Sequence, residues 1–74
     1  MELIEKRLFR AHDDALTIPE QMRKLEEELM AQGYDIEPSG APVVILKLDD
    51  GEVHYVPGDG GIWQYIFEYE GENE

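Results

Sequence analysis

The sequence predicts an α+β domain in which N-terminal helical segments pack on one face of a three-stranded antiparallel β-meander. Three observations predict this fold class. A capped amphipathic segment covers residues 18–32, β-branched runs flank an Asp-Gly pair within residues 43–56, and aromatic residues alternate strictly over residues 62–69. Because the chain has 74 residues, we expect residues 1–74 to form a single small domain.

The predicted helix begins and ends at recognisable signals. Thr17 and Glu20 have the spacing of a capping box, and Pro19 in the first turn loses no hydrogen bond. Gly33 can adopt the left-handed conformation that ends a helix, and Tyr34 can then pack back on the last turn. Between these ends, apolar residues at steps of four and three form one face: Ile18, Met22, Leu25 and Leu29.

Residues 2–12 do not match one period cleanly. Ile4, Leu8 and Ala11 keep helical spacing, but the other apolar residues of this segment do not. We expect a short helix, ended by the His-Asp-Asp sequence at residues 12–14, because Asp side chains compete for nearby backbone amides.

A β-hairpin is predicted after a linker of Pro, Ser and Gly at residues 38–42. The run at residues 43–48 is β-branched and too short for a buried helix. Asp50 and Gly51 match the two central residues of a type I′ turn, and residues 53–56 form the returning strand. This register predicts four core-facing residues: Leu46, Leu48, Val53 and Tyr55.

The last predicted strand, residues 62–69, follows a loop at residues 57–61. One of its faces is wholly aromatic, with Trp63, Tyr65, Phe67 and Tyr69. As core, this face supplies large apolar area; as surface, it forms a partner or self-association patch, because Tyr and Trp are enriched at binding hot spots. We favour the core, which leaves Ile62 and Ile66 on the opposite side, where a second copy could bind.

The formal net charge is −12, from eighteen Asp and Glu residues against six Lys and Arg residues. Residues 1–37 carry a net charge of −5, whereas residues 38–74 carry −7 and contain Lys47 as their one base. Because phosphate contacts require Lys and Arg, direct nucleic-acid binding is the class that this composition disfavours most. The acidic tail at residues 70–74 is expected to be frayed.

No pattern in the sequence forces a particular chemistry. It has no cysteine, one serine, and two histidines at His12 and His54, so we predict no enzyme activity and no cofactor. The acidic glycine-bearing loops at residues 49–52 and 58–61 lack calcium-ligand and phosphate-loop spacing, so we predict turns and no metal site. A charged N-terminus and the lack of cysteine predict a cytoplasmic protein without a membrane span.

These features predict a small acidic binding protein that inhibits or regulates a basic partner, such as a nuclease or another nucleic-acid-binding protein. It would act by nucleic-acid mimicry, with its surplus carboxylates on one coherent patch that occupies the positive surface of the partner. Restriction inhibitors, nuclease immunity proteins and CRISPR inhibitors share this composition. The alternative is a homo-oligomeric structural or accessory domain of a phage or bacterial system, with a homodimer through the sheet and charge that serves solubility. The candidate partner-binding residues are Asp49, Asp50, Glu52, Asp59, Glu68, Glu70, Glu72, Trp63, Tyr65 and Tyr69.

Overall fold

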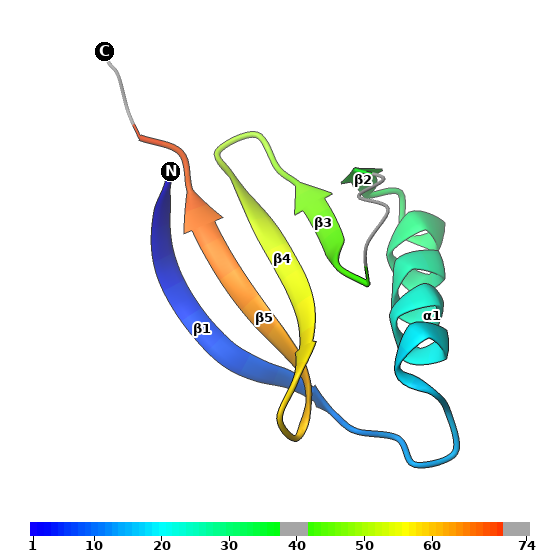
Figure 1. The fold of residues 1–74 in the computed structure, drawn as a ribbon. Coiled ribbons are helices and arrows are strands. Elements are labelled where there is room, and N and C mark those ends of the chain that lie inside the picture. The colour runs from blue at the N-terminus through cyan, green and yellow to red at the C-terminus, as the bar shows by residue number, and fades with distance from the viewer. Residues whose placement is uncertain (38–41, 71–74) are drawn as a thin grey trace.

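A computed structural model describes residues 1–37 and 42–70, in which five strands and one helix form (Figure 1). All five strands join one antiparallel sheet in the order β1-β5-β4-β3-β2. The chain therefore enters at one edge, crosses through the helix to the other edge, and returns by successive hairpins (Figure 1). The elements are β1 (Glu2–Ala11), α1 (Ile18–Ala31), β2 (Asp35–Glu37), β3 (Val44–Lys47), β4 (Gly51–Gly58) and β5 (Gly61–Glu68).

The predicted fold of N-terminal helical segments on a three-stranded meander is wrong. The meander of β3, β4 and β5 is only the centre of a five-stranded sheet, and residues 2–12 supply the edge strand β1 instead of a short helix. Two register shifts against β5 leave Ile4 and Phe9 as extra residues in β1. Each bulge changes which side chains share a face, which explains why the apolar residues of this segment matched neither period.

α1 begins and ends at the signals that the sequence predicts. The Thr17 hydroxyl accepts a hydrogen bond from the Glu20 amide, and the Glu20 carboxylate accepts one from the Thr17 amide, which completes the capping box. At the other end Gly33 has a φ of 92°. The Tyr34 amide donates back to the Leu29 carbonyl, as in a Schellman cap.

The apolar stripe of α1 packs on one face of the sheet and makes the core there. α1 contacts β2 and β3 and lies near their edge of the sheet (Figure 1). Most of β1, at the opposite edge, is therefore uncovered, and nine of its ten residues are exposed. The buried core residues are Met22, Leu25 and Leu29 of α1 with Val44, Leu46, Val53, Tyr55 and Ile62 of the strands.

The β3–β4 hairpin has a different register from the predicted one. Lys47 pairs with Glu52, so the tip of the turn lies at residues 49–50 instead of residues 50–51. Because the pairing shifts by two residues, the faces of the strands are preserved, and three of the four predicted core residues of this hairpin are buried. Leu48 is the exception, since it moves into the turn and is 39% exposed.

The β4–β5 hairpin decides which face the aromatic residues occupy. Gly58 pairs with Gly61 across a two-residue turn, where the sequence predicted a loop over residues 57–61. Since side chains alternate along a strand, this register places Ile62 beneath the helix, 2% exposed, and the aromatic residues of β5 on the opposite face. The core interpretation of the aromatic stripe is therefore wrong. The expectation that Ile62 and Ile66 lie on a face open to a second copy is also wrong, because Ile62 is part of the core and Ile66 packs against it.

Candidate interaction surfaces

A group of carboxylates lies at one end of the sheet, where the β3–β4 turn meets the end of β5 (Figure 1). Glu68 pairs with Gly51 at the start of β4, and the Tyr69 amide donates to the Asp50 carbonyl at 2.9 Å. These contacts hold the turn against the last residues of β5. We call this group the acidic end; its members are Asp49, Asp50, Glu52, Glu68 and Glu70.

The negative charge of the acidic end is only partly compensated within the chain. The N-terminal amine lies 3.1 Å from the Glu70 carboxylate. Glu2 adds a further negative charge beside the group, because β1 places it directly opposite Glu68. Like charges in that position destabilise a sheet. Lys47 on the neighbouring strand binds Glu37 at 2.8 Å, and from its place opposite Glu52 its charge also helps to lower the pKa of that carboxyl. A cationic ligand at this end would therefore relieve repulsion that the folded chain retains.

Two side-chain hydrogen bonds tie Glu52 into the fold. Its Oε1 accepts a hydrogen bond from His54 Nε2 at 2.9 Å, and its Oε2 accepts one from the Tyr69 hydroxyl at 3.0 Å. The His54 hydrogen bond is the main reason that the pKa of Glu52 is lowered, and the Tyr69 bond adds to it against the opposing effect of burial. Burial, followed by the bond to Glu52, raises the pKa of Tyr69.

The lowered pKa of Glu52 predicts a specific dependence of stability on pH. Glu52→Gln is expected to lower the free energy of unfolding by about 1 kcal/mol at neutral pH, because the ionised acceptor of two hydrogen bonds is lost. A carboxylate with a lowered pKa stabilises the fold above its ordinary pKa of 4.5, and this contribution is lost as the pH falls through the folded value. The difference between the variant and the wild type should therefore shrink below pH 4.5.

Urea unfolding of both proteins at several pH values measures this difference. Tyr69→Phe is the matched control, since it removes one of the two donors and keeps the carboxylate. It should show a smaller loss of stability at neutral pH than Glu52→Gln. The role given to the ionised Glu52 carboxylate would be contradicted if the difference in unfolding free energy between the wild type and Glu52→Gln stayed the same from neutral to acid pH.

The sheet face opposite α1 carries the aromatic residues of β5, and we call it the open face. Trp63 lies between Leu8 of β1 and Val56 of β4, and Tyr65 lies between Lys6 and His54. The Lys6 ammonium is 5.4 Å from the Trp63 ring centroid and 5.2 Å from that of Tyr65, which allows a cation–π interaction with both rings. The members of the open face on these three strands are Leu3, Lys6, Leu8, Glu52, His54, Val56, Trp63, Tyr65 and Phe67.

The structure brings some predicted binding residues together and separates others. Tyr69 joins the acidic end through its bond to Glu52. Asp59 lies in the β4–β5 turn at the opposite end of the sheet, where its carbonyl accepts a hydrogen bond from Trp63 Nε1 at 2.8 Å. Glu72 and the rest of the tail expected to be frayed, other than Glu70, lie outside the described residues, as does most of the predicted linker at residues 38–42.

Sequence reasoning missed Glu2, which the fold places next to the predicted acids. Nothing in the local sequence distinguishes Glu2 from the other exposed glutamates. Its position follows from the pairing of β1 with β5, which joins residues more than sixty positions apart. Only the recognition of residues 2–11 as a strand could have suggested this neighbourhood.

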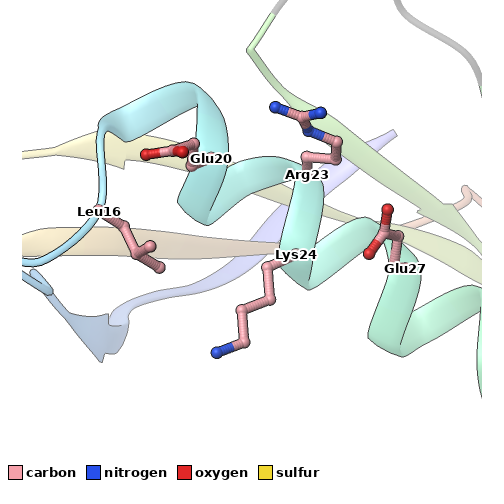
Figure 2. A pocket seen from close by; sticks show the side chains of 5 residues that line it. All are labelled: Leu16, Glu20, Arg23, Lys24 and Glu27. Carbon is pink, nitrogen blue, oxygen red and sulfur yellow. The ribbon is translucent and has the colours of Figure 1, made fainter.

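A shallow hollow on α1 is lined by residues of both charges. Figure 2 shows the side chains of Arg23 and Lys24 pointing away from each other, with Glu20 and Glu27 on the same helix and Leu16 before it. The arrangement therefore has no group of converging charges. Across residues 1–37 and 42–70, no cluster of three or more His, Asp or Glu side chains could hold a metal ion. Within those ranges, no helix is long and apolar enough to cross a membrane.

Comparisons with known proteins add nothing to this description. No family model matches the chain, and no curated protein or solved structure matches it significantly.

Proposed function

We propose that this protein binds a basic, nucleic-acid-handling partner through the acidic end and thereby blocks the positive surface of that partner. Five carboxylates lie at this end of the sheet, from the β3–β4 turn, the start of β4 and the end of β5, with Glu2 opposite Glu68. Glu52 is on the open face and Glu68 on the other face, so both faces carry negative charge here. Neighbouring strands of a sheet are about 5 Å apart, so the charges are closely spaced, like those along a nucleic-acid backbone. This concentration of fixed negative charge is the observation that carries the proposal.

The bases of the chain support this proposal because they neutralise carboxylates elsewhere. Arg10 binds Glu28 of α1 at 2.9 Å, and Lys47 binds Glu37 of β2 at 2.8 Å. Arg10 lies outside the acidic end, and Lys47, although it stands opposite Glu52, makes its short contact with Glu37. The residual charge is therefore concentrated where a cationic surface can reach it, and this arrangement steers association with a basic partner.

Tyr69 and the edge of the open face give the acidic end an aromatic border. Tyr69 is 40% exposed, and Phe67 lies next to Glu52 across the β4–β5 pair. Aromatic residues beside charges supply anchoring area at an interface. We place the interaction in the cytosol, since a chain without cysteine fits a reducing compartment.

Affinity capture with the immobilised wild type, followed by mass spectrometry, tests the proposal. A basic protein should be retained at low salt and released at high salt. In a direct binding assay with that protein, a variant with a neutralised acidic end should bind at least about tenfold more weakly, because rim charges are lost. Its substitutions are Asp49→Asn, Asp50→Asn, Glu68→Gln and Glu70→Gln.

A second variant separates the acidic end from net charge in general. It removes the same four negative charges from α1 and from the loops at the other end of the sheet, and it should bind within about twofold of the wild type. Equal weakening of both variants would contradict a local docking surface, and so would failure to capture any basic protein. The control substitutions are Asp14→Asn, Glu26→Gln, Glu27→Gln and Asp59→Asn.

A further inference from the structure

β1 is a long edge strand whose outer side has no partner in the described part of the chain. It pairs with β5 alone, and α1 leaves most of it uncovered, although Arg10 near its end binds Glu28 of the helix. Its apolar residues are unusually open to solvent, with exposed fractions of 47% for Leu3, 53% for Ile4, 45% for Leu8 and 37% for Phe9. Natural proteins seldom leave such an edge uncovered, because it can pair with another strand.

The charges of β1 are arranged so that the strand complements itself. Glu2 and Glu5 lie in its first half, and Lys6, Arg7 and Arg10 follow. β1 thus holds three of the six bases of the chain and is net positive in a protein of charge −12. An antiparallel copy of the same strand would set the acidic half of each against the basic half of the other.

We propose that two copies of this chain pair through antiparallel β1 strands, with Lys6 on the twofold axis, so that their sheets join into one. In this register Glu5 of each copy lies opposite Arg7 of the other, and Glu2 lies opposite Arg10. Leu8 of each copy also lies opposite Ile4 of the other. Leu3 and Phe9 lie on different faces of β1, since Leu3 pairs with Phe67 and Phe9 packs against Tyr55. The interface uses the same residues on both copies, as a twofold dimer requires.

Neighbouring registers lack this match. A shift of two residues keeps the side chains on the same faces, and it sets either Glu5 or Arg7 opposite itself across the axis. Neither of these shifted registers sets an acid of one copy opposite a base of the other. Charge complementarity therefore selects the register centred on Lys6.

The two Lys6 residues at the axis do not oppose this pairing. Each ammonium is already drawn towards its own β5, where it lies 5.4 Å from the Trp63 ring and 5.2 Å from the Tyr65 ring. Glu2 faces Glu68 within its own chain and would lie opposite Arg10 of the second copy, which also binds Glu28 of that copy at 2.9 Å.

The opposite edge of the sheet does not offer the same possibility. β2 has only three residues, and its charged members Asp35 and Glu37 are both acidic. An antiparallel copy of β2 would set like charges against each other. Of the two edge strands, β1 is therefore the one that we expect to pair with a second copy.

Cysteine cross-linking tests the register directly, because the chain has no cysteine of its own. Residues directly opposite each other in an antiparallel pair have Cα atoms about 4.5 to 5.5 Å apart, within reach of a disulfide. Lys6→Cys should therefore form a disulfide-linked dimer at least about tenfold faster than Lys24→Cys on α1. Equal rates for the two variants would overturn the proposed register.

Charge reversal tests the interface without a covalent bond. The wild type should show twice its 8.5 kDa mass by light scattering, whereas Glu5→Arg alone and Arg7→Glu alone should dimerise at least about tenfold more weakly, since like charges then meet twice. Mixing the two variants should restore a dimer, because each Arg then faces a Glu. Circular dichroism checks that each variant is folded.

Two results would overturn the dimer. One is a wild-type mass of 8.5 kDa at all concentrations that remain soluble. The other is a dimer whose strength does not change in Glu5→Arg. Glu5 and Arg7 both lie outside the acidic end. Loss of the dimer proposal would therefore not affect the proposal that a basic partner binds the acidic end, which the capture experiment tests separately.

Discussion

Gly61→Ala is expected to lower the free energy of unfolding by about 3 kcal/mol, the sum of an overpacking cost and a strained backbone. Gly61 has a φ of 147°, in the region that favours glycine. It also pairs with Ala11 at the end of β1. A Cβ there would lie 2.8 Å from the carbonyl carbon of Ala11 and from the amide nitrogen of His12. Because these neighbours are backbone atoms, β1 would have to move away from β5.

Gly60→Ala is the matched control for the neighbouring position. Gly60 also has a positive φ, of 86°, but a Cβ there would meet nothing within 4 Å. Its expected cost is only the backbone strain, about 1 kcal/mol. Urea unfolding of both variants measures the difference, and equal losses would contradict the close approach of β1 to this turn.

Leu25→Ala is expected to cost about 3 kcal/mol, which is the usual loss for a large-to-small change in a core. Leu25 is the most deeply buried side chain of α1, with 1% exposure. A domain this short buries a modest fraction of its surface and is stable by about 5 kcal/mol. The single substitution should therefore remove most of its stability.

Met30→Ala on the same helix is the control for Leu25→Ala. Met30 is 59% exposed and lies outside the core, so its loss should change the free energy of unfolding by no more than about 0.5 kcal/mol. Thermal unfolding followed by circular dichroism compares the two. Similar midpoints for both variants would show that α1 does not pack on the sheet through its Leu25 face.

Local signals allowed α1 to be predicted, because they act within a few residues. The Thr17 to Glu20 capping box, the positive φ of Gly33 and the apolar spacing between them each depend on one turn of helix. β1 could not be predicted in this way. Its bulges at Ile4 and Phe9 are defined only by its pairing with the distant strand β5.

The faces of the sheet depended on turn lengths that the sequence left open. The Asp-Gly pair predicted a turn at residues 50–51, but Gly51 is required instead for its close approach to β5. Gly51 has no positive φ, and a Cβ there would collide with the Phe67 carbonyl of β5. At the next hairpin, the length of the turn decided that Ile62, and not Trp63, faces the helix.

The candidate site was predictable only in part for the same reason. Asp49, Asp50 and Glu52 are neighbours in the sequence, so their grouping needed no knowledge of the fold. Their proximity to Glu68 depends on the pairing of β4 with β5. That pairing also removes Asp59 to the far end of the sheet, although it is only a few positions from Glu52 in the chain.

The claim that the acidic end is the docking surface is tested most directly by NMR on the isotopically labelled chain. The basic protein recovered by capture is added in steps, and backbone amide shifts are followed. We expect the largest shifts on residues 49–52 and 68–70, while the amides of Glu26 and Glu27 in α1 stay unchanged. Shifts concentrated on α1, or spread evenly over all surface carboxylates, would contradict it.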